Sequence, residues 1–157
     1  MEGIIIRSAT IEDVGQLSDM YCEMYDILFD YGMPYKLNRG IIGEILVLQL
    51  KARACKYLVA EKDGQLVGFV AVDVMRMDRK LSYKNNVIAH IRDIYVSPDV
   101  GRTGIGTELL AKAEDWAKEN GASIIECNVI ADNKPAQIFW DDNQYEVLGK
   151  IYCKKFE

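Results

Sequence analysis

The sequence has few of the residues that metal centres and disulfide frameworks need. It contains one histidine and four cysteines among 157 residues. Zinc sites and disulfide frameworks use clustered or regularly spaced ligands, but the cysteines are scattered, at Cys22, Cys55, Cys127 and Cys153. We therefore expect no bound metal and a reducing, cytoplasmic environment.

Long apolar runs and an excess of positive charge are also missing. No uninterrupted apolar stretch approaches the roughly 20 residues of a membrane-spanning helix. The opening MEGIIIRSAT has no sustained apolar segment of the kind found in secretory signals. The formal net charge of −5 is unfavourable for a nucleic-acid surface and mildly favourable for a cationic substrate. We expect neither a membrane nor a nucleic acid as a partner.

The apolar residues are numerous enough to form a core. Half of the chain is hydrophobic, and no repeat or linker divides it, so we expect a single domain over 1–157. Runs of antiparallel strands and one strand–helix–strand crossover predict an α+β fold. The strands are expected at 3–7, 57–60, 66–75, 88–96, 123–130 and 145–156, and the helices at 11–30, 37–54, 105–120 and 135–141.

The most informative stretch joins a predicted strand to a predicted helix. Gly101, Gly104 and Gly106 lie between the strand at 88–96 and the helix at 105–120. The free N–H groups of a first helical turn and the helix dipole attract anions. Glycine lets the backbone approach an anion without a Cβ in the way. The stretch therefore predicts a pyrophosphate site.

Two better-known phosphate loops fit this stretch poorly. The first and third glycines have the spacing of a P-loop, but Thr107-Glu108 stands where Lys-Ser/Thr is required. A Rossmann fingerprint would need glycine or alanine at Leu109. What remains is a diphosphate held mainly by backbone, with Arg102 and Thr103 nearby. A P-loop-like nucleotide binder is the weakest alternative.

Two motifs resemble those of the GNAT superfamily of N-acetyltransferases. Ile94-Tyr95-Val96 followed by Gly101-Arg102-Thr103-Gly104-Ile105-Gly106 is similar to the family's acetyl-CoA loop, a strand followed by Arg/Gln-x-x-Gly-x-Gly/Ala, except that Gly101 replaces Arg/Gln. Asn133-Lys134-Pro135-Ala136-Gln137-Ile138-Phe139-Trp140 resembles the later Asn-x-x-Ala-x-x-Phe-Tyr motif. The resemblance implies a mixed, mostly antiparallel sheet of about six to seven strands. It also implies helices on both faces and a splay between the fourth and fifth strands.

By this resemblance, acetyl-CoA lies in the splay between the two strands. Its pantetheine arm would pair with exposed main chain as an added strand does. The N–H of Tyr95 or Val96 would stabilise the oxyanion that develops on the thioester. Asn133 would both contact the cofactor and cap a helix. The predicted cofactor contacts are Ile94, Tyr95, Val96, Gly101, Arg102, Thr103, Gly104, Ile105, Gly106, Thr107, Asn133, Ala136, Phe139 and Trp140.

Acetyl transfer to an amine also involves a general base for the ammonium and, in many members of the family, a general acid for the departing thiolate. An alkyl ammonium has a pKa near 10.4, so a general base helps to form the free amine. His90, Asp93 and Glu126 are the candidate bases. Trp140 stands where many members have an acidic tyrosine, and an indole cannot give up its proton in this pH range. Tyr145 is the substitute acid, or no acid is needed, because a thiol of pKa near 8.5 leaves readily as thiolate.

The resemblance places much of the acceptor pocket on the helix pair between the first two strands. Asp26, Asp30, Tyr31 and Tyr35 are the candidate amine contacts there. The alternative is a solvated loop whose aromatic residues pack locally.

Together these features predict an acetyl-CoA-dependent N-acetyltransferase. It would act by direct transfer in a ternary complex, on a primary amine of a small molecule, a peptide or a protein. A non-catalytic acyl-CoA-binding sensor or regulatory module is the alternative, because Gly101 and Trp140 both depart from the family motifs. A homodimer is the candidate assembly.

Overall fold

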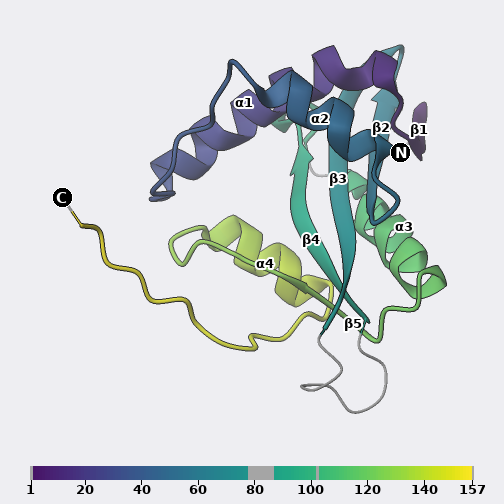
Figure 1. The fold of residues 1–157 in the computed structure, drawn as a ribbon. Coiled ribbons are helices and arrows are strands. Elements are labelled where there is room, and N and C mark those ends of the chain that lie inside the picture. The colour runs from purple at the N-terminus through teal and green to yellow at the C-terminus, as the bar shows by residue number, and fades with distance from the viewer. Residues whose placement is uncertain (1, 78–86, 102, 157) are drawn as a thin grey trace.

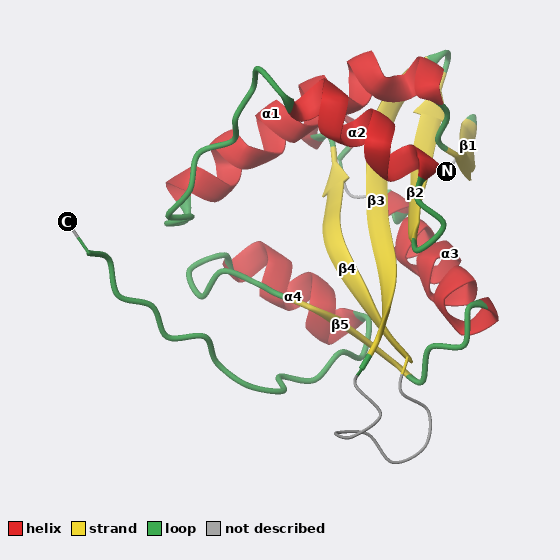
Figure 2. Cartoon of the chain, viewed as in Figure 1, coloured by secondary structure: helices red, strands yellow, loops and turns green. Residues whose placement is uncertain are grey.

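The computed structural model describes residues 2–77, 87–101 and 103–156. In this part of the chain, five strands form one sheet in the order β1-β2-β3-β4-β5 (Figures 1 and 2). The strands are β1 (Ile4–Ser8), β2 (Cys55–Lys62), β3 (Gln65–Arg76), β4 (Val87–Val96) and β5 (Ile124–Cys127). The helices are α1 (Val14–Asp30), α2 (Ile42–Lys51), α3 (Ile105–Glu119) and α4 (Lys134–Asp142), with short 3-10 turns at Ile11–Asp13 and Pro98–Val100.

Helices cover both faces of the sheet, as the sequence predicts (Figure 1). α1 and α2 pack on one face through a buried cluster that includes Leu17, Leu46 and Phe69. On the opposite face, Leu109 of α3 and Trp140 of α4 belong to a second buried cluster. Residues of the central strands alternate between the two clusters, because successive side chains of a strand point to opposite faces.

The connections between strands follow local turn chemistry. In the β2–β3 hairpin, Asp63 has φ 51° and Gly64 has φ 78°, the two positive angles that a type I′ turn requires. β1 through β4 are antiparallel neighbours, whereas β4 and β5 are parallel. Parallel neighbours need a crossover, which α3 provides. The prediction of an α+β fold with a mixed, mostly antiparallel sheet is confirmed.

A β-bulge in β4 shapes the centre of the molecule. Ala71 of β3 lies opposite Asp93 and Val72 lies opposite Ile91, so Arg92 is the extra residue in β4. A bulge bends its strand and increases the local twist. β4 pairs with β5 only as far as Ile91 and Cys127, although β4 continues to Val96. The two strands diverge from that point (Figure 2), which is the predicted splay.

The prediction of six to seven strands is wrong for the described residues, which form five. The expected strand at 145–156 is extended but unpaired, because no other described segment lies alongside it to complete a ladder. The helix expected at 37–54 begins only at Ile42. Of the residues between the strands expected at 66–75 and 88–96, those at 78–86 lie outside the described residues. None of the helices described here is both long and apolar enough to span a membrane.

Candidate active site

The turn between β4 and α3 has the geometry of an anion site. Gly101 has φ 65° and ψ −162°, and Gly104, the N-cap of α3, has φ 79°. L side chains rarely adopt either conformation. The N–H of Glu108 donates to the carbonyl of Gly104 at 3.0 Å, which is the first bond of the helix. The N–H groups of residues 105–107 therefore precede the helical ladder and point out of its start.

The third glycine of the motif has a packing role. A Cβ on Gly106 would lie 3.1 Å from Cε2 of Phe139 and 3.7 Å from Cγ2 of Val96. The absence of a Cβ lets the start of α3 pack closely against α4 and β4, because an added Cβ would require Phe139 to shift by a few tenths of an ångström. The two sequence motifs thus meet at this contact. Of the loop's polar residues, Thr103 is exposed and Arg102 lies outside the described residues.

The backbone of β4 beyond the bulge faces the splay at alternate residues. The N–H of Ser97 donates to the carbonyl of Val67 on the β3 side at 2.8 Å. Main-chain hydrogen-bonding direction alternates along a strand, so Tyr95 also points to β3. The N–H and carbonyl groups of Ile94 and Val96 then point into the splay, where no described strand pairs with them. Of the two amides predicted for the oxyanion, only that of Val96 has this direction.

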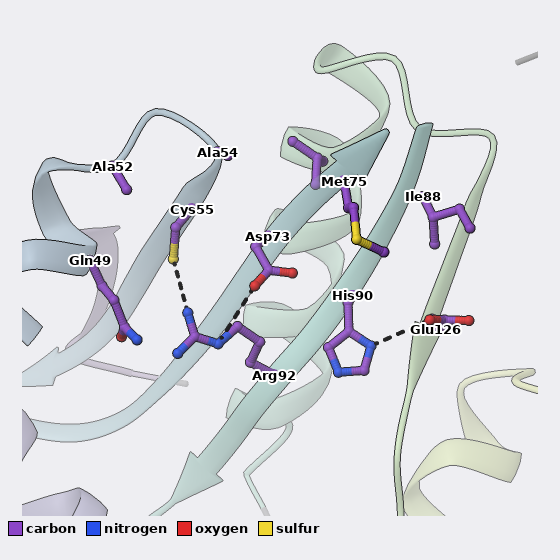
Figure 3. Close-up of a pocket in the computed structure, with 11 residues that line it drawn as sticks. Gln49, Ala52, Ala54, Cys55, Asp73, Met75, Ile88, His90, Arg92 and Glu126 are labelled. Atoms are coloured by element: carbon purple, nitrogen blue, oxygen red, sulfur yellow. Dashed lines mark hydrogen bonds and ion pairs between the residues drawn. The ribbon is translucent and has the colours of Figure 1, made fainter. Parts of the chain in front are cut away.

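A pocket of about 460 Å³ opens on the α2-covered side of β4 (Figure 3). Within it, Nδ1 of His90 lies 3.7 Å from Oε1 of Glu126. Nε of Arg92 lies 3.6 Å from Oδ2 of Asp73, and the same guanidinium contacts Sγ of Cys55 at 3.7 Å. The pocket is lined by Gln49, Ala52, Ala54, Cys55, Asp73, Val74, Met75, Ile88, His90, Arg92 and Glu126.

Asp93 lies outside the lining of this pocket and is connected to it by a chain of hydrogen bonds. The hydroxyl of Tyr21 donates to Oδ2 of Asp93 at 2.7 Å and lies 3.0 Å from the hydroxyl of Tyr57. Tyr57 in turn donates to Oε1 of Gln49, which lines the pocket. Burial raises the pKa of Asp93, while the Tyr21 bond and the charge of Arg92 oppose that rise. The pKa of the Asp93 carboxyl therefore lies above its ordinary value, with burial as the main cause.

The α4 residues expected to meet the cofactor belong mainly to the core. The ring of Trp140 is buried, 5.1 Å from that of Phe139 and 4.7 Å from that of Tyr145. The hydroxyl of Tyr145 is buried without a hydrogen-bond partner among the described residues, and burial raises its pKa above the ordinary value. Oδ1 of Asn133 accepts a hydrogen bond from the N–H of Ala136 at 3.2 Å, so Asn133 caps α4.

Comparison with known proteins identifies this arrangement. The family model described as "Acetyltransferase (GNAT) family" matches residues 17–143. The chain belongs to the GNAT family. Its motifs, its sheet and the splay beside α3 are therefore those of a GNAT acetyltransferase.

Relatives and solved structures agree with the GNAT assignment. An uncharacterised N-acetyltransferase of Methanocaldococcus jannaschii is 32% identical over 135 residues, which are 86% of this chain and 57% of that protein. The chain thus spans little more than half of that relative. The aminoalkylphosphonate N-acetyltransferase of Salmonella typhimurium is 27% identical over 86% of this chain and 80% of its own length. A crystal structure from Clostridium acetobutylicum, titled a predicted acetyltransferase with acetyl-CoA, has a TM-score of 0.77, 16% identity and coverage of 97% and 96%.

The four acceptor residues expected for this GNAT chain lie away from the pocket. Asp26 pairs with Arg39 at 2.5 Å on the surface. Asp30 and Tyr35 are exposed and Tyr31 is half-buried, at the end of α1 and in the loop that follows. Their role in binding an amine stays a prediction, but none of the four lines the pocket that contains His90.

Several side chains of the GNAT site were not singled out in the sequence. Tyr21 bonds to Asp93 from 72 residues away, and Tyr57 bonds to Tyr21 from 36 residues away, separations that no local pattern reveals. Asp73 faces His90 across the β3–β4 ladder. Pairing the two predicted strands in antiparallel register is the one signal that could have indicated this contact.

Proposed function

We propose that the chain transfers the acetyl group of acetyl-CoA to a primary amine by direct transfer in a ternary complex. One observation carries the proposal: the β4–β5 ladder stops at Ile91 and Cys127, beside the open start of α3. That arrangement offers an anion site and a length of unpaired strand edge within one groove of the sheet.

The cofactor would lie along this groove. The N–H groups of residues 105–107 suit a diphosphate, and the left-handed glycines at 101 and 104 present no Cβ toward it. Acetyl-CoA supplies an activated acyl group on a thiol of pKa near 8.5, which leaves readily as thiolate. The amides of Ile94 and Val96 are the donors available to the thioester oxygen, which becomes negative in the transition state.

The amine would occupy the pocket on the α2 side of β4. His90 is the best-placed base, because its imidazole is partly exposed to the pocket. It would take the proton of the ammonium before attack, and the Glu126 carboxylate at 3.7 Å would stabilise the imidazolium that results. Asp93 is the alternative base, linked to the pocket through Tyr21, Tyr57 and Gln49.

The acceptor that fits best is a small cationic amine. A volume of about 460 Å³ lies in the range of small-molecule sites. Two carboxylates in the pocket, those of Asp73 and Glu126, favour a positive charge, although Arg92 partly neutralises the first. A lysine of a peptide would have to reach into this pocket with its side chain extended.

Thiol release on mixing protein, acetyl-CoA and a panel of amines tests the proposal. We expect release that depends on both substrates, with an acid limb in the pH–rate profile. His90→Gln should lower turnover most near neutral pH and change the shape of the pH–rate profile, whereas Asp93→Asn should leave that shape in place. A changed profile in Asp93→Asn alone would transfer the role to Asp93.

The sensor alternative gives a different result in the same assay. It is favoured by one observation, the burial of Trp140 in the core at the position where many members have a tyrosine acid. Tight binding of CoA with no turnover on any amine would support the sensor and contradict the proposal.

A further inference from the structure

Four side chains connect the centre of the sheet to the proposed acceptor pocket. Oδ2 of Asp93 lies 2.7 Å from the hydroxyl of Tyr21, which lies 3.0 Å from the hydroxyl of Tyr57. The Tyr57 hydroxyl in turn contacts Oε1 of Gln49, which extends from α2 toward the strands (Figure 3). We call these four side chains the Asp93–Gln49 network. Of the four, only Gln49 lines the pocket.

The network has three contacts but only two hydroxyl hydrogens. Each hydroxyl supplies one hydrogen, whereas a carboxylate and an amide oxygen only accept. If Tyr21 donates to a charged Asp93 and Tyr57 donates to Gln49, no hydrogen lies between the two hydroxyl oxygens. A partly satisfied network in the interior is costly. A third hydrogen is therefore needed, and the two ends of the network can each supply one.

The first source of the third hydrogen is a proton on Asp93. A neutral carboxyl donates to Tyr21, Tyr21 donates to Tyr57, and Tyr57 donates to Gln49, so all three contacts become hydrogen bonds. The amide of Gln49 then has its oxygen toward Tyr57, which is the orientation in the structure. Its NH₂ group has no hydrogen-bond partner among the described residues and is left to the pocket.

The second source is the amide of Gln49 itself. When Asp93 loses its proton to solvent, both hydroxyls turn toward the carboxylate, and Tyr57 then needs a donor. A half-turn of the terminal amide exchanges its oxygen and nitrogen, which occupy nearly equivalent positions. The NH₂ group then donates to Tyr57, and Oε1 faces the pocket. The two arrangements differ by one proton on Asp93 and by the orientation of one amide.

We propose that Gln49 is a specificity-determining contact for the acceptor amine and that the charge of Asp93 sets the orientation of its amide. Tyr21 and Tyr57 are positioning residues, because they connect the carboxyl to the amide. With Asp93 charged, Oε1 accepts a hydrogen bond from the ammonium or amine. With Asp93 neutral, the NH₂ group occupies that place and repels the same group. The contact with an amine rests on the proposed function, whereas the coupling of Asp93 to Gln49 does not.

Groups on four elements face Asp93 and determine its charge. Arg92 and a protonated His90, on its own strand, favour the charged form, whereas burial and Asp73 of β3 disfavour it. The other neighbours stay uncharged near neutral pH, because burial raises their pKa values: Tyr21 and Tyr25 of α1, and Cys55 and Tyr57 of β2. Within the network, Asp93 is therefore the member whose charge changes below neutral pH.

NMR titration of the side-chain amides tests the coupling without any substrate. In wild-type chain labelled with nitrogen-15 and with carboxyl-labelled aspartate, the Gln49 NH₂ resonances should shift with the same midpoint as the Asp93 carboxyl. The NH₂ group of Gln137, which donates to the carbonyl of Ala131 on the surface, is the internal control and should not follow that midpoint. Gln49 resonances that stay fixed while Asp93 titrates would overturn the proposal. An Asp93 that does not titrate in the folded chain would overturn it equally.

Tyr57→Phe removes the hydroxyl that contacts Gln49. The Gln49 response should disappear in this variant while Asp93 still titrates. Tyr25→Phe is the matched control, because it removes a half-buried hydroxyl of α1 that lies outside the network, and its Gln49 response should persist. A Gln49 response that survives in Tyr57→Phe would contradict the role of the network.

Kinetics with acetyl-CoA and an accepted amine test the contact with the acceptor. As the pH rises through the Asp93 midpoint, the KM for the amine should fall about tenfold more in wild type than in Gln49→Leu, which cannot accept a hydrogen bond. The pH profile of kcat should be the same in both. An equal pH dependence of KM in the two proteins would refute the amine contact. The absence of turnover on any amine would instead refute the proposed function, and the NMR titration would still decide the coupling.

Discussion

Gly104 adopts the left-handed backbone conformation that the turn before α3 requires. Its φ of 79° starts α3 and directs the N–H groups of residues 105–107 outward. Valine is strained at this angle, so Gly104→Val should reorient the turn and remove measurable CoA binding by calorimetry. The matched control is Gly3→Val, since Gly3 has φ 76° beside β1, far from the turn. Gly3→Val should lose stability but keep its affinity for CoA. Equal affinity in Gly104→Val and wild type would contradict this account of the turn.

The hydrogen bond from Tyr21 lowers the pKa of Asp93 and so opposes the larger effect of burial. The Tyr21 hydroxyl donates to the carboxylate at 2.7 Å and so favours the charged form. Tyr21→Phe removes that donor and should raise the pKa of Asp93 further above its ordinary value, as followed by carbonyl-carbon NMR of labelled aspartate. Unfolding should become easier by about 1–3 kcal/mol, because a buried carboxylate loses a partner. Tyr57→Phe leaves the Tyr21 bond intact and should move the pKa less. An unmoved Asp93 titration in Tyr21→Phe would show that the bond does not control it.

At the residue scale, prediction succeeded where neighbours in sequence decide the structure. The left-handed glycines and the Asn133 cap follow from local motifs. The bond from Tyr21 to Asp93 joins α1 to β4 across 72 residues, and nothing in either segment indicates it. The indole of Trp140 packs in the core, and its predicted contact with the cofactor stays a prediction.

The junction of β1 and α1 is held by a partly buried ion pair between Arg7 and Asp13. Nη1 and Nη2 of Arg7 each lie 2.8 Å from the Asp13 carboxylate, which also accepts the N–H of Thr10 at 2.7 Å. The Arg7 bond is the main reason why the pKa of Asp13 lies below its ordinary value. The carboxylate therefore stabilises the fold at pH above that ordinary value, and the contribution is lost as the pH falls through the folded-state pKa.

Asp13→Asn should lower the free energy of unfolding by about 1–3 kcal/mol at neutral pH. Urea unfolding across pH should show the gap to wild type closing in acid. Glu12→Gln, at an exposed neighbouring position, should change little. A gap that stays constant from neutral to acid pH would rule out the ion pair as its cause.

The end of α4 contains a strained position that offers a gain in stability. Gln144 has φ 67°, and the N–H of the next residue, Tyr145, bonds back to Trp140 to close the helix. Glycine is the residue such caps favour, because L side chains are strained in this conformation. Gln144→Gly should raise the free energy of unfolding by about 1 kcal/mol. Asn143→Gly, at φ −93°, should give no gain. A loss in Gln144→Gly would show that its side chain makes an unrecognised contact.

At the element scale, the sequence predicted most helices and strands because period and capping are local properties. It placed the start of α2 too early. The N–H of Ile41 bonds to the carbonyl of Asn38, and the Asn38 side chain accepts the N–H of Gly40, so a turn precedes the helix. The strand expected at 145–156 has the right alternation, but a strand also requires a neighbour, which its own described sheet does not supply.

At the scale of the whole molecule, the site depends on the β-bulge at Arg92. The β4–β5 ladder stops at Ile91, directly before the extra residue, and Nε of Arg92 lies 3.6 Å from Oδ2 of Asp73, on the side where His90 lines the pocket. Sequence alternation alone does not locate a bulge, because a bulge is defined by its pairing partner. The splay was therefore predictable only through resemblance to the family. The residues at which β4 and β5 separate are given by the strand pairing in the structure.

A crystal structure of the chain with CoA tests the central claim most directly. We predict diphosphate oxygens about 3 Å from the N–H groups of residues 105–107. The pantetheine arm should run beside the open main chain of Ile94 and Val96. A CoA molecule bound elsewhere, or a turn at 101–106 closed over by its own side chains, would contradict the account.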